Sequence, residues 1–501
     1  MHSTPQPALP FDVAGIRLDG PGPLARQLVE QLRQRMLQGQ LPAGARMPAT
    51  RDLAAALGVS RNTVVRAFEH LLDEGLISSR VGDGSYVTPP LAQMVSPRAR
   101  SPSRASAPTL SPEPQTPCWQ ALQHFTPSRT PDGPVRAFRW GSPAMDLFPA
   151  ALWSRLQARA WRRHSVSDLA YGDPAGLPAL REWLADYLRS ARGLPCDAEQ
   201  ILITGGAQQG IALAALALLG PGDEAATESP GYRSAAAALG LQAARVHHVP
   251  VDAEGLRPAA LETLGSRCRL LYVTPSHQFP TGVAMSLQRR MDLLAWARRQ
   301  QAWILEDDYD SEYRHVGLPL APLASLDTAG RTLYVGSLSK LMFPGLRLGY
   351  LVAPPAWLPT LARLRSVLDR HSACMDQQVM AAFIAEGHFL RHVRRMRRAA
   401  RERRDALLEA WDRHIAPLGL PLPAPEAGLH AYLPLPGAAL EQRLTEAAVR
   451  ARLEVGAMRR VGGLPESSAR AGLVLGFAAV TAPGLSDAVV RLAQAWRPEL
   501  G

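Results

Sequence analysis

Apolar residues in the N-terminal part of the chain recur at the three- and four-residue spacing of amphipathic helices. The pattern predicts a helix from Leu24 to a stop at Gly39, a second over residues 49–57, and a third that begins after Ser60 as its N-cap. Two short strands are expected over residues 76–87, because an Asp-Gly pair suits a tight hairpin. Helix, glycine turn, helix and hairpin make up the α+β layout of a winged helix-turn-helix.

The C-terminal part alternates short apolar runs with amphipathic helical segments, which is typical of an α/β fold. The runs ILIT, LLYV, WILE and TLYV, which begin at residues 201, 270, 303 and 332, predict buried strands. Polar residues follow each run, and open α/β sheets bind ligands at the carboxyl ends of their strands. We therefore expect a ligand site along that edge.

A proline-rich segment separates the two parts. Residues 89–134 contain 11 of the 44 prolines, mixed with Ser, Thr and Arg, which indicates an extended linker. The sequence thus predicts a multi-domain chain with an N-terminal arm over residues 1–22, a winged helix over 23–88, a linker over 89–135 and a larger α/β domain over 136–501.

Composition narrows the class of protein. The net charge of +11 favours a polyanionic partner, although a general compositional bias explains it equally well. No apolar run reaches the roughly 18 residues of a membrane span, and the N-terminus lacks a signal peptide pattern. The four cysteines have neither disulfide nor metal-ligand spacing. We expect a cytoplasmic protein with no membrane contact and no metal site.

Lys340 is the single lysine among 55 basic residues. Unlike a guanidinium, an amine can lose its proton and add to a carbonyl, so chemistry is a better explanation than chance. A cofactor with an aldehyde, a phosphate and a pyridine nitrogen needs a lysine, phosphate donors, a carboxylate and a hydroxyl. Asp307 and Tyr309 supply the last two from one face of a strand, while Glu306 and Asp308 point to the other face.

The segment LPAGARMPATRDLAAALGVSRNTVVRAFEHLLDEGLISSRVGDGSYV closely resembles the winged helix of GntR-type bacterial regulators. The resemblance implies binding to a double-stranded DNA operator, with the start of the third helix in the major groove. Basic residues outnumber acidic ones by only two over residues 23–88, so we expect a dimer or additional contacts to contribute. The candidate DNA-binding residues are Arg51, Arg61, Asn62, Thr63, Arg66 and Gly84.

The region after residue 136 looks like a type I pyridoxal-phosphate aminotransferase, and the whole chain resembles the MocR family of regulators. The family implies Lys340 as the Schiff-base lysine, Asp307 on the pyridine nitrogen and Tyr309 on the phenolic oxygen of pyridoxal 5'-phosphate. It also implies phosphate contacts, a stacking tyrosine, and a tyrosine that reaches the partner subunit of a homodimer. Tyr232 is the stacking tyrosine and Tyr171 is the tyrosine that reaches the partner subunit. The phosphate contacts are Gly206, Ala207, Gln208, Ser337, Ser339 and Arg347.

Two positions depart from the aminotransferase pattern. Phe279 stands where an asparagine usually touches the ring oxygen, so His277 or Gln278 is expected to substitute. Val474 aligns with the arginine that usually binds a substrate carboxylate, and Arg470 lies nearby but off register. The second departure favours an effector other than an ordinary α-amino acid.

An arginine-rich segment, residues 391–404, places arginines at i, i+3, i+4 and i+7 on one helical face. A solvated face is the ordinary interpretation. Alternatively, Arg394, Arg397, Arg398 and Arg401 supply phosphate contacts that the winged helix lacks.

These patterns predict a transcriptional regulator that senses pyridoxal phosphate or its adduct with an amine, with control of vitamin B6 genes as the favoured subtype. The alternatives are an active aminotransferase with a DNA-binding appendage, and a degenerate fold that binds DNA without a cofactor. We expect at most slow half-reactions of transamination. The sequence leaves the effector, the operator and the direction of regulation open.

Overall fold

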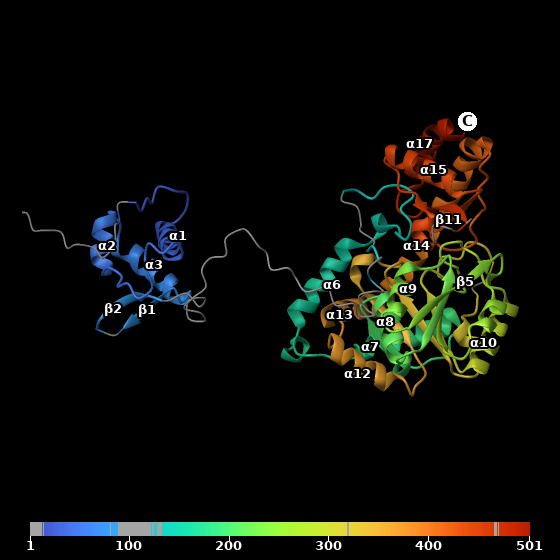
Figure 1. Cartoon of the computed structure of the whole chain (residues 1–501), viewed down its shortest axis with the longest axis horizontal. Helices are drawn as coiled ribbons and strands as arrows, with labels where there is room; N and C mark the ends of the chain where they lie inside the picture. The colour runs from blue at the N-terminus through green and yellow to red at the C-terminus, as the bar shows by residue number, and fades with distance from the viewer. Residues whose placement is uncertain are drawn as a thin grey trace, which may run out of the picture. The chain divides into compact units, whose positions relative to one another are not determined.

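The computed structural model describes residues 13, 15–80, 82–88, 122, 125–127, 133–317, 320–464, 468 and 470–500. The chain divides into two compact units, residues 1–113 and 114–501, which are drawn in Figure 1 and described separately below. Most of the expected N-terminal arm and linker falls outside the described residues.

The first unit has the predicted winged-helix elements. They are α1 (Leu24–Leu37), α2 (Thr50–Leu57), α3 (Arg61–Asp73), β1 (Ile77–Arg80) and β2 (Gly84–Val87). Gly58 ends α2 with a left-handed φ of 64°, and Ser60 caps α3 by accepting a 3.2 Å hydrogen bond from the Thr63 amide. The apolar faces of the three helices pack into one core, which confirms the helical periods.

A mixed eight-stranded sheet organises the second unit, in the order β3-β10-β9-β8-β7-β4-β5-β6. Strands β9, β8, β7, β4 and β5 run parallel, while β10 is antiparallel to both of its neighbours. The strands are β3 (Ile201–Thr204), β4 (Glu224–Ser229), β5 (Arg245–Asp252), β6 (Gly255–Leu256), β7 (Cys268–Val273), β8 (Trp303–Asp308), β9 (Thr332–Ser337) and β10 (Gly349–Val352).

Helices cover both faces of this sheet. Leu270, Leu305 and Leu333 belong to the core beneath α8 (Ala207–Leu218), whereas Leu271 and Ile304 belong to the core beneath α10 (Leu287–Gln300). The other helices are α6 (Ala150–Arg163), α7 (Pro178–Tyr187), α9 (Arg233–Gly240), α11 (Leu323–Leu326), α12 (Leu358–Leu368), α13 (Cys374–Ala385), α14 (His388–His414), α15 (Ala438–Arg450), α16 (Met458–Val461) and α17 (Ala482–Leu500).

A second, smaller sheet has the order β11-β13-β12. Its strands are β11 (His430–Leu435), β12 (Gly456–Ala457) and β13 (Ala471–Gly476), and Figure 1 shows β11 near α14, α15 and α17. Within the described part of the chain, we find no helix with the length and apolar character needed to cross a membrane.

Candidate functional site

A cavity of about 220 Å³ lies at the carboxyl ends of β8 and β9, the edge where the sequence predicts ligand binding. It brings together nine of the eleven predicted cofactor residues, from segments far apart in the chain. Gly206 adjoins the cavity without lining it, and Tyr171 lies elsewhere. The lining residues are Trp140, Gly141, Ala207, Gln208, Tyr232, Tyr272, Phe279, Asp307, Tyr309, Asp310, Ser337, Ser339, Lys340, Pro344, Arg347, Leu429 and His430.

Lys340 follows β9 and extends its side chain into this cavity. Its Nζ donates a 2.5 Å hydrogen bond to the carbonyl oxygen of Gly141. Burial lowers the pKa of Lys340, and the nearby carboxylates of Asp310 and Asp307 oppose that shift. The amine therefore loses its proton more easily than a solvated lysine does, which is what addition to a carbonyl requires.

Asp307 presents a free carboxylate oxygen near this amine. The hydroxyl of Tyr272 donates a 2.7 Å hydrogen bond to Oδ2, whereas buried Oδ1 has no hydrogen-bond partner among the described residues. Burial raises the pKa of Asp307 to about 7, despite the hydrogen bond from Tyr272. An orphaned buried acceptor of this kind is suited to a protonated ring nitrogen.

The alternation predicted along β8 is confirmed. Asp308 points away from the cavity and accepts a hydrogen bond from the buried Arg192 at 3.1 Å. Glu306 accepts from the amides of Leu323 and Ala324, each at 2.8 Å. These acids have structural partners, which leaves Asp307 as the strand's acidic group at the cavity.

An anion cradle lies at the N-terminus of α8. Gly206 precedes the helix with φ of 97°, a left-handed conformation that favours glycine. A Cβ placed on Gly206 would lie 3.0 Å from Nη1 of Arg347, so glycine leaves room for that guanidinium. Ser337 and Ser339 line the same region, where the free amides of the first turn also favour a phosphate. The residues present therefore fit pyridoxal phosphate at each of its polar groups.

Aromatic rings enclose the rest of the cavity. Phe279 makes edge contacts with Tyr232 and Tyr309, with ring centroids 5.8 and 6.0 Å apart. Trp140 packs on Phe279 at 5.8 Å. The Tyr309 hydroxyl is 3.0 Å from Nδ1 of His277, which itself lies behind the cavity wall.

Gln278, one of the two expected substitutes for the missing asparagine, hydrogen-bonds to the backbone and does not line the cavity. Its Nε2 donates to the carbonyl oxygens of Pro230 and Phe279 at 2.8 and 2.6 Å. His277 does not line the cavity, and its Nδ1 contacts two residues that do, Tyr309 and Asp310. Phe279 itself lines the cavity at the position where the asparagine was expected.

Val474 does not line the cavity but packs against part of its wall. Val474 is fully buried and packs with Phe279 and Val461. Arg470 donates a 2.8 Å hydrogen bond to the Val251 carbonyl and is not among the cavity residues, consistent with the off-register alignment.

Tyr171 is 81% exposed and packs on His371, with ring centroids 6.0 Å apart. It does not line the cavity of its own chain. Its expected contact with a partner subunit therefore stays a prediction.

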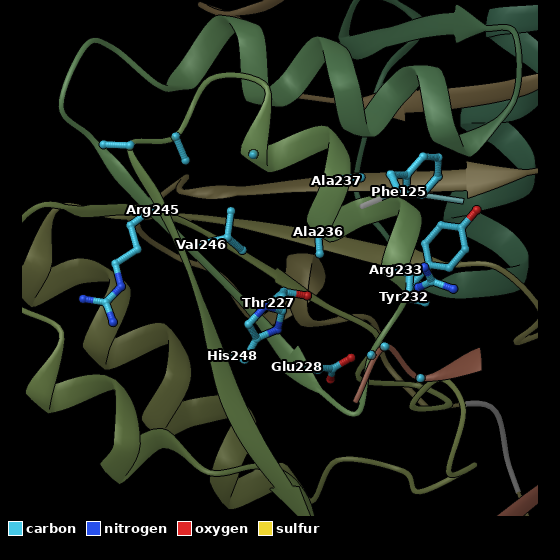
Figure 2. Close-up of a pocket in the computed structure, with 16 residues that line it drawn as sticks. Phe125, Thr227, Glu228, Tyr232, Arg233, Ala236, Ala237, Arg245, Val246 and His248 are labelled. Atoms are coloured by element: carbon cyan, nitrogen blue, oxygen red, sulfur yellow. The ribbon is translucent and has the colours of Figure 1, made fainter. Parts of the chain in front are cut away.

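A second hollow of about 740 Å³ lies beside α9 and shares Tyr232 with the first cavity. Figure 2 shows Tyr232 and Phe125 at one end of it and Arg245 at the other. Burial raises the pKa of Glu228, which lines this hollow, to about 7. The Thr274 hydroxyl donates a 2.6 Å hydrogen bond to that carboxyl group, so Glu228 fixes the loop that carries His277.

The winged helix exposes Arg61 and Asn62 in the first turn of α3, and Arg51 in the first turn of α2. Arg66 is also exposed on α3, whereas Thr63 is half-buried with its Oγ1 2.9 Å from the Oγ of the capping Ser60.

Gly84 begins the second strand of the wing with φ of 120°. Two further arginines contact the wing, and both lie in the GntR-like segment although neither is among the predicted DNA-binding residues. Nη2 of Arg46 donates a 2.6 Å hydrogen bond to the Asp83 carbonyl beside this glycine. The guanidinium of Arg80 stacks 4.7 Å from the Tyr86 ring centre.

All four arginines predicted to share a face of α14 are exposed, namely Arg394, Arg397, Arg398 and Arg401. Arg397 also donates a 2.5 Å hydrogen bond to the Glu312 carbonyl, so part of its guanidinium is engaged within the domain.

Several site residues were not foreseen, namely Trp140, Gly141, Tyr272, Asp310 and His430. The segment FRWGSP and the strand that contains Tyr272 stand out in the sequence, but neither carries a motif. The adjacency of Tyr272 to Asp307 depends on strand order, which the local sequence does not encode.

Two family models match the chain: bacterial regulatory proteins of the gntR family over residues 24–87, and aminotransferase class I and II over residues 145–470. A protein of Rhizobium meliloti described as "Probable rhizopine catabolism regulatory protein MocR" is 39% identical over 399 residues, 79% of each chain. The "HTH-type pyridoxine biosynthesis transcriptional regulator PdxR" of Corynebacterium glutamicum is 33% identical, covering 82% of this chain and 83% of that one.

Among solved structures, the α-aminoadipate aminotransferase LysN of Thermus thermophilus, complexed with N-(5'-phosphopyridoxyl)-L-leucine, is similar with a TM-score of 0.66 and 29% identity. The match covers 73% of this chain and 92% of that one. The fold and site thus define a helix-turn-helix transcriptional regulator with a type I aminotransferase fold. Within that class, the chain belongs to the MocR family of GntR-type regulators.

Proposed function

We propose that this regulator binds pyridoxal 5'-phosphate in the cavity at Lys340 and changes its affinity for a DNA operator when the cofactor, or its adduct with an amine, is bound. One observation carries the proposal. A buried amine with a lowered pKa, an orphaned carboxylate oxygen and an anion cradle meet in one cavity. The protein would then have two conformations that differ in their affinity for DNA. For the ligand to change DNA binding, it must bind one of these conformations more tightly than the other.

Each group has a distinct task in this proposal. The bound cofactor supplies an electrophilic carbonyl. Lys340 provides the attacking amine, held toward the Gly141 carbonyl until it reacts. Asp307 stabilises a positive ring nitrogen through Oδ1, and Arg347 with the first turn of α8 binds the phosphate. Tyr232 and Phe279 exclude water from the ring faces.

The apolar surroundings of Val474 favour the cofactor itself, or a small amine without a carboxylate, as the effector. We accordingly favour control of vitamin B6 genes. A carboxylate placed against Val474 would lose its hydration without gaining a cation, which is costly. This argues against an ordinary aminotransferase, the principal alternative, because turnover needs productive binding of an amino acid.

The proposed arrangement assigns residues 23–88 to DNA binding, 89–135 to the linker and 136–501 to effector binding. We further propose a homodimer in which exposed Tyr171 reaches the partner's cofactor phosphate. A dimer would also supply the second winged helix that a symmetric operator requires.

Borohydride reduction of the protein incubated with pyridoxal phosphate, followed by peptide mass spectrometry, tests cofactor attachment. The proposal predicts stoichiometric modification of Lys340 and none in Lys340→Arg. Assays with amino acids and keto acids test the enzyme alternative, since multiple turnovers would favour it. The absence of both cofactor attachment and turnover would support a DNA-binding protein with a degenerate site.

A further inference from the structure

His277, which lies behind the cavity wall, and Asp310, which lines the cavity, have no role among the proposed cofactor contacts. His277 and Asp310 are 3% and 2% exposed, respectively, and come from the loop after β7 and the end of β8. Nδ1 of His277 lies 3.0 Å from Oδ1 of Asp310 and also 3.0 Å from the hydroxyl oxygen of Tyr309. One ring nitrogen therefore serves two oxygens.

A ring nitrogen offers either one hydrogen or one lone pair. An ionised Asp310 can only accept, so Nδ1 of His277 carries the hydrogen and shares it between the carboxylate and the Tyr309 oxygen. The Tyr309 oxygen is then an acceptor toward His277. The hydroxyl hydrogen of Tyr309 is therefore not used toward His277. Because Tyr309 lines the cavity, this hydrogen is free to point into it.

We propose that Asp310 and His277 form a positioning dyad that commits the Tyr309 hydroxyl to donate into the cavity, toward the phenolic oxygen of the bound cofactor. The inference rests on the proposed function, because it names that oxygen as the acceptor. It also accounts for Phe279 in place of the usual asparagine. His277 compensates for the lost amide through Tyr309 rather than by touching the ligand.

The surroundings of His277 favour a hydrogen on Nδ1 over a hydrogen on Nε2. Buried Nε2 has no hydrogen-bond partner among the described residues, so a hydrogen there would be an unpaired donor. The ring of His430 packs 5.0 Å away, and burial lowers its pKa to about 3, so it stays neutral. Other titratable groups that act electrostatically on this region include Asp307, Asp308, Glu228, Tyr313, His315 and Lys340.

A glycine fixes the position of the His277 ring. A Cβ on Gly428 would lie only 2.0 Å from Cε1 of His277, so backbone packs directly against the imidazole. Gly428 has φ of 78°, which also favours glycine. The ring therefore has little freedom to rotate away from Tyr309.

The test is the pH dependence of visible absorbance in the full-length protein loaded with pyridoxal phosphate. A hydrogen bond from Tyr309 withdraws negative charge from the phenolic oxygen and so reduces proton affinity at the Lys340 nitrogen. His277→Phe keeps the ring volume but removes the donor, and should raise the titration midpoint by about one unit. His277→Asn places an amide nitrogen near the Nδ1 position and should largely restore it.

Two further variants distinguish an effect through the Tyr309 hydroxyl from a general disturbance of the packing around His277. Tyr309→Phe should raise the midpoint by itself, and adding His277→Phe to it should change nothing more, because the dyad acts through the hydroxyl. His315→Gln, which changes a neighbouring histidine bonded to the Gly428 carbonyl at 2.9 Å, should leave the midpoint near that of the unmodified protein.

An unshifted midpoint in His277→Phe, or additive shifts in the double variant, would overturn the dyad while leaving cofactor binding intact. Retention of one zinc equivalent by His277, Asp310 and His430, whose donor atoms lie within 4.8 Å of one another, would overturn it as well. A complete lack of visible absorbance would overturn the proposed function together with the dyad.

Discussion

The winged helix and the cofactor cavity assemble their functional groups in opposite ways. Arg61 and Asn62 occupy consecutive positions at the exposed start of one helix, where a cap and a glycine stop suffice to place them. Gly141, Asp307 and Lys340 come from separate segments and meet only when the large sheet has formed. In the proposed function, the first region is an exposed surface that binds a polyanion, and the second is a buried site for covalent attachment of a cofactor.

This difference in assembly affects how each region tolerates amino-acid substitutions. An exposed arginine can be removed at the cost of its own interaction, because its surroundings are already solvated. A buried group such as Asp307 is held by Tyr272 and is coupled electrostatically to Lys340, so its removal disturbs several neighbours. Substitutions in the winged helix should therefore act additively, whereas those in the cavity should not.

The largest expected effect is at Lys340. Lys340→Ala and Lys340→Arg should both abolish visible absorbance on addition of pyridoxal phosphate, because neither side chain can form the imine. Absorbance titration measures this directly. The arginine variant is the matched control, since it keeps a positive charge. A visible band in either variant would show that another group captures the cofactor.

The next largest effect is expected for substitutions at the start of α3 in the winged helix. Arg61→Ala or Asn62→Ala should each weaken operator binding by about 1–3 kcal/mol, or roughly 5- to 150-fold, if the side chain contacts base edges. Anisotropy with operator and scrambled DNA separates base recognition from phosphate binding. Glu69→Ala, an exposed change farther along α3, is the control. Equal decreases on both DNAs would assign Arg61 to phosphate binding instead.

A smaller effect, this time an increase in affinity, is expected at Val474. Val474→Arg should strengthen the binding of α-amino acids to the cofactor-loaded protein by about tenfold, through a charge-assisted pair with their carboxylate. Val474→Met is the control for added volume without charge. Isothermal titration with an amino acid and the corresponding amine compares the ligands. Equal increases for both would mean that the arginine does not meet the carboxylate.

The smallest expected effect is at the exposed face of α14. Replacing Arg394, Arg398 and Arg401 should reduce the magnitude of the salt slope of DNA binding by about 0.9 for each phosphate that the variant no longer neutralises. The slope of log affinity against log salt is the measurement, with Arg413→Ala at the far end of α14 as control. An unchanged slope would mean that the face is merely solvated.

The sequence predicts the winged helix almost completely, because its helices, caps and hairpin are local. It also predicts four strands of the large sheet, β3, β7, β8 and β9, and the opposite orientations of Asp307 and Asp308, which follow from the period of two. It does not predict that Tyr272 bonds Asp307, or that Gly141 receives the Lys340 hydrogen bond. Those interactions depend on strand order and on a segment that packs across the sheet edge.

The most direct test of the central claim is anisotropy of the protein on its own upstream intergenic DNA, with and without pyridoxal phosphate. Allosteric coupling is typically about 5- to 150-fold in affinity, and we expect a shift in that range for the unmodified protein. Lys340→Arg should bind the DNA with the same affinity in the presence and absence of pyridoxal phosphate. Specific binding that is the same with and without pyridoxal phosphate in both proteins would contradict the claim that this cofactor regulates DNA affinity.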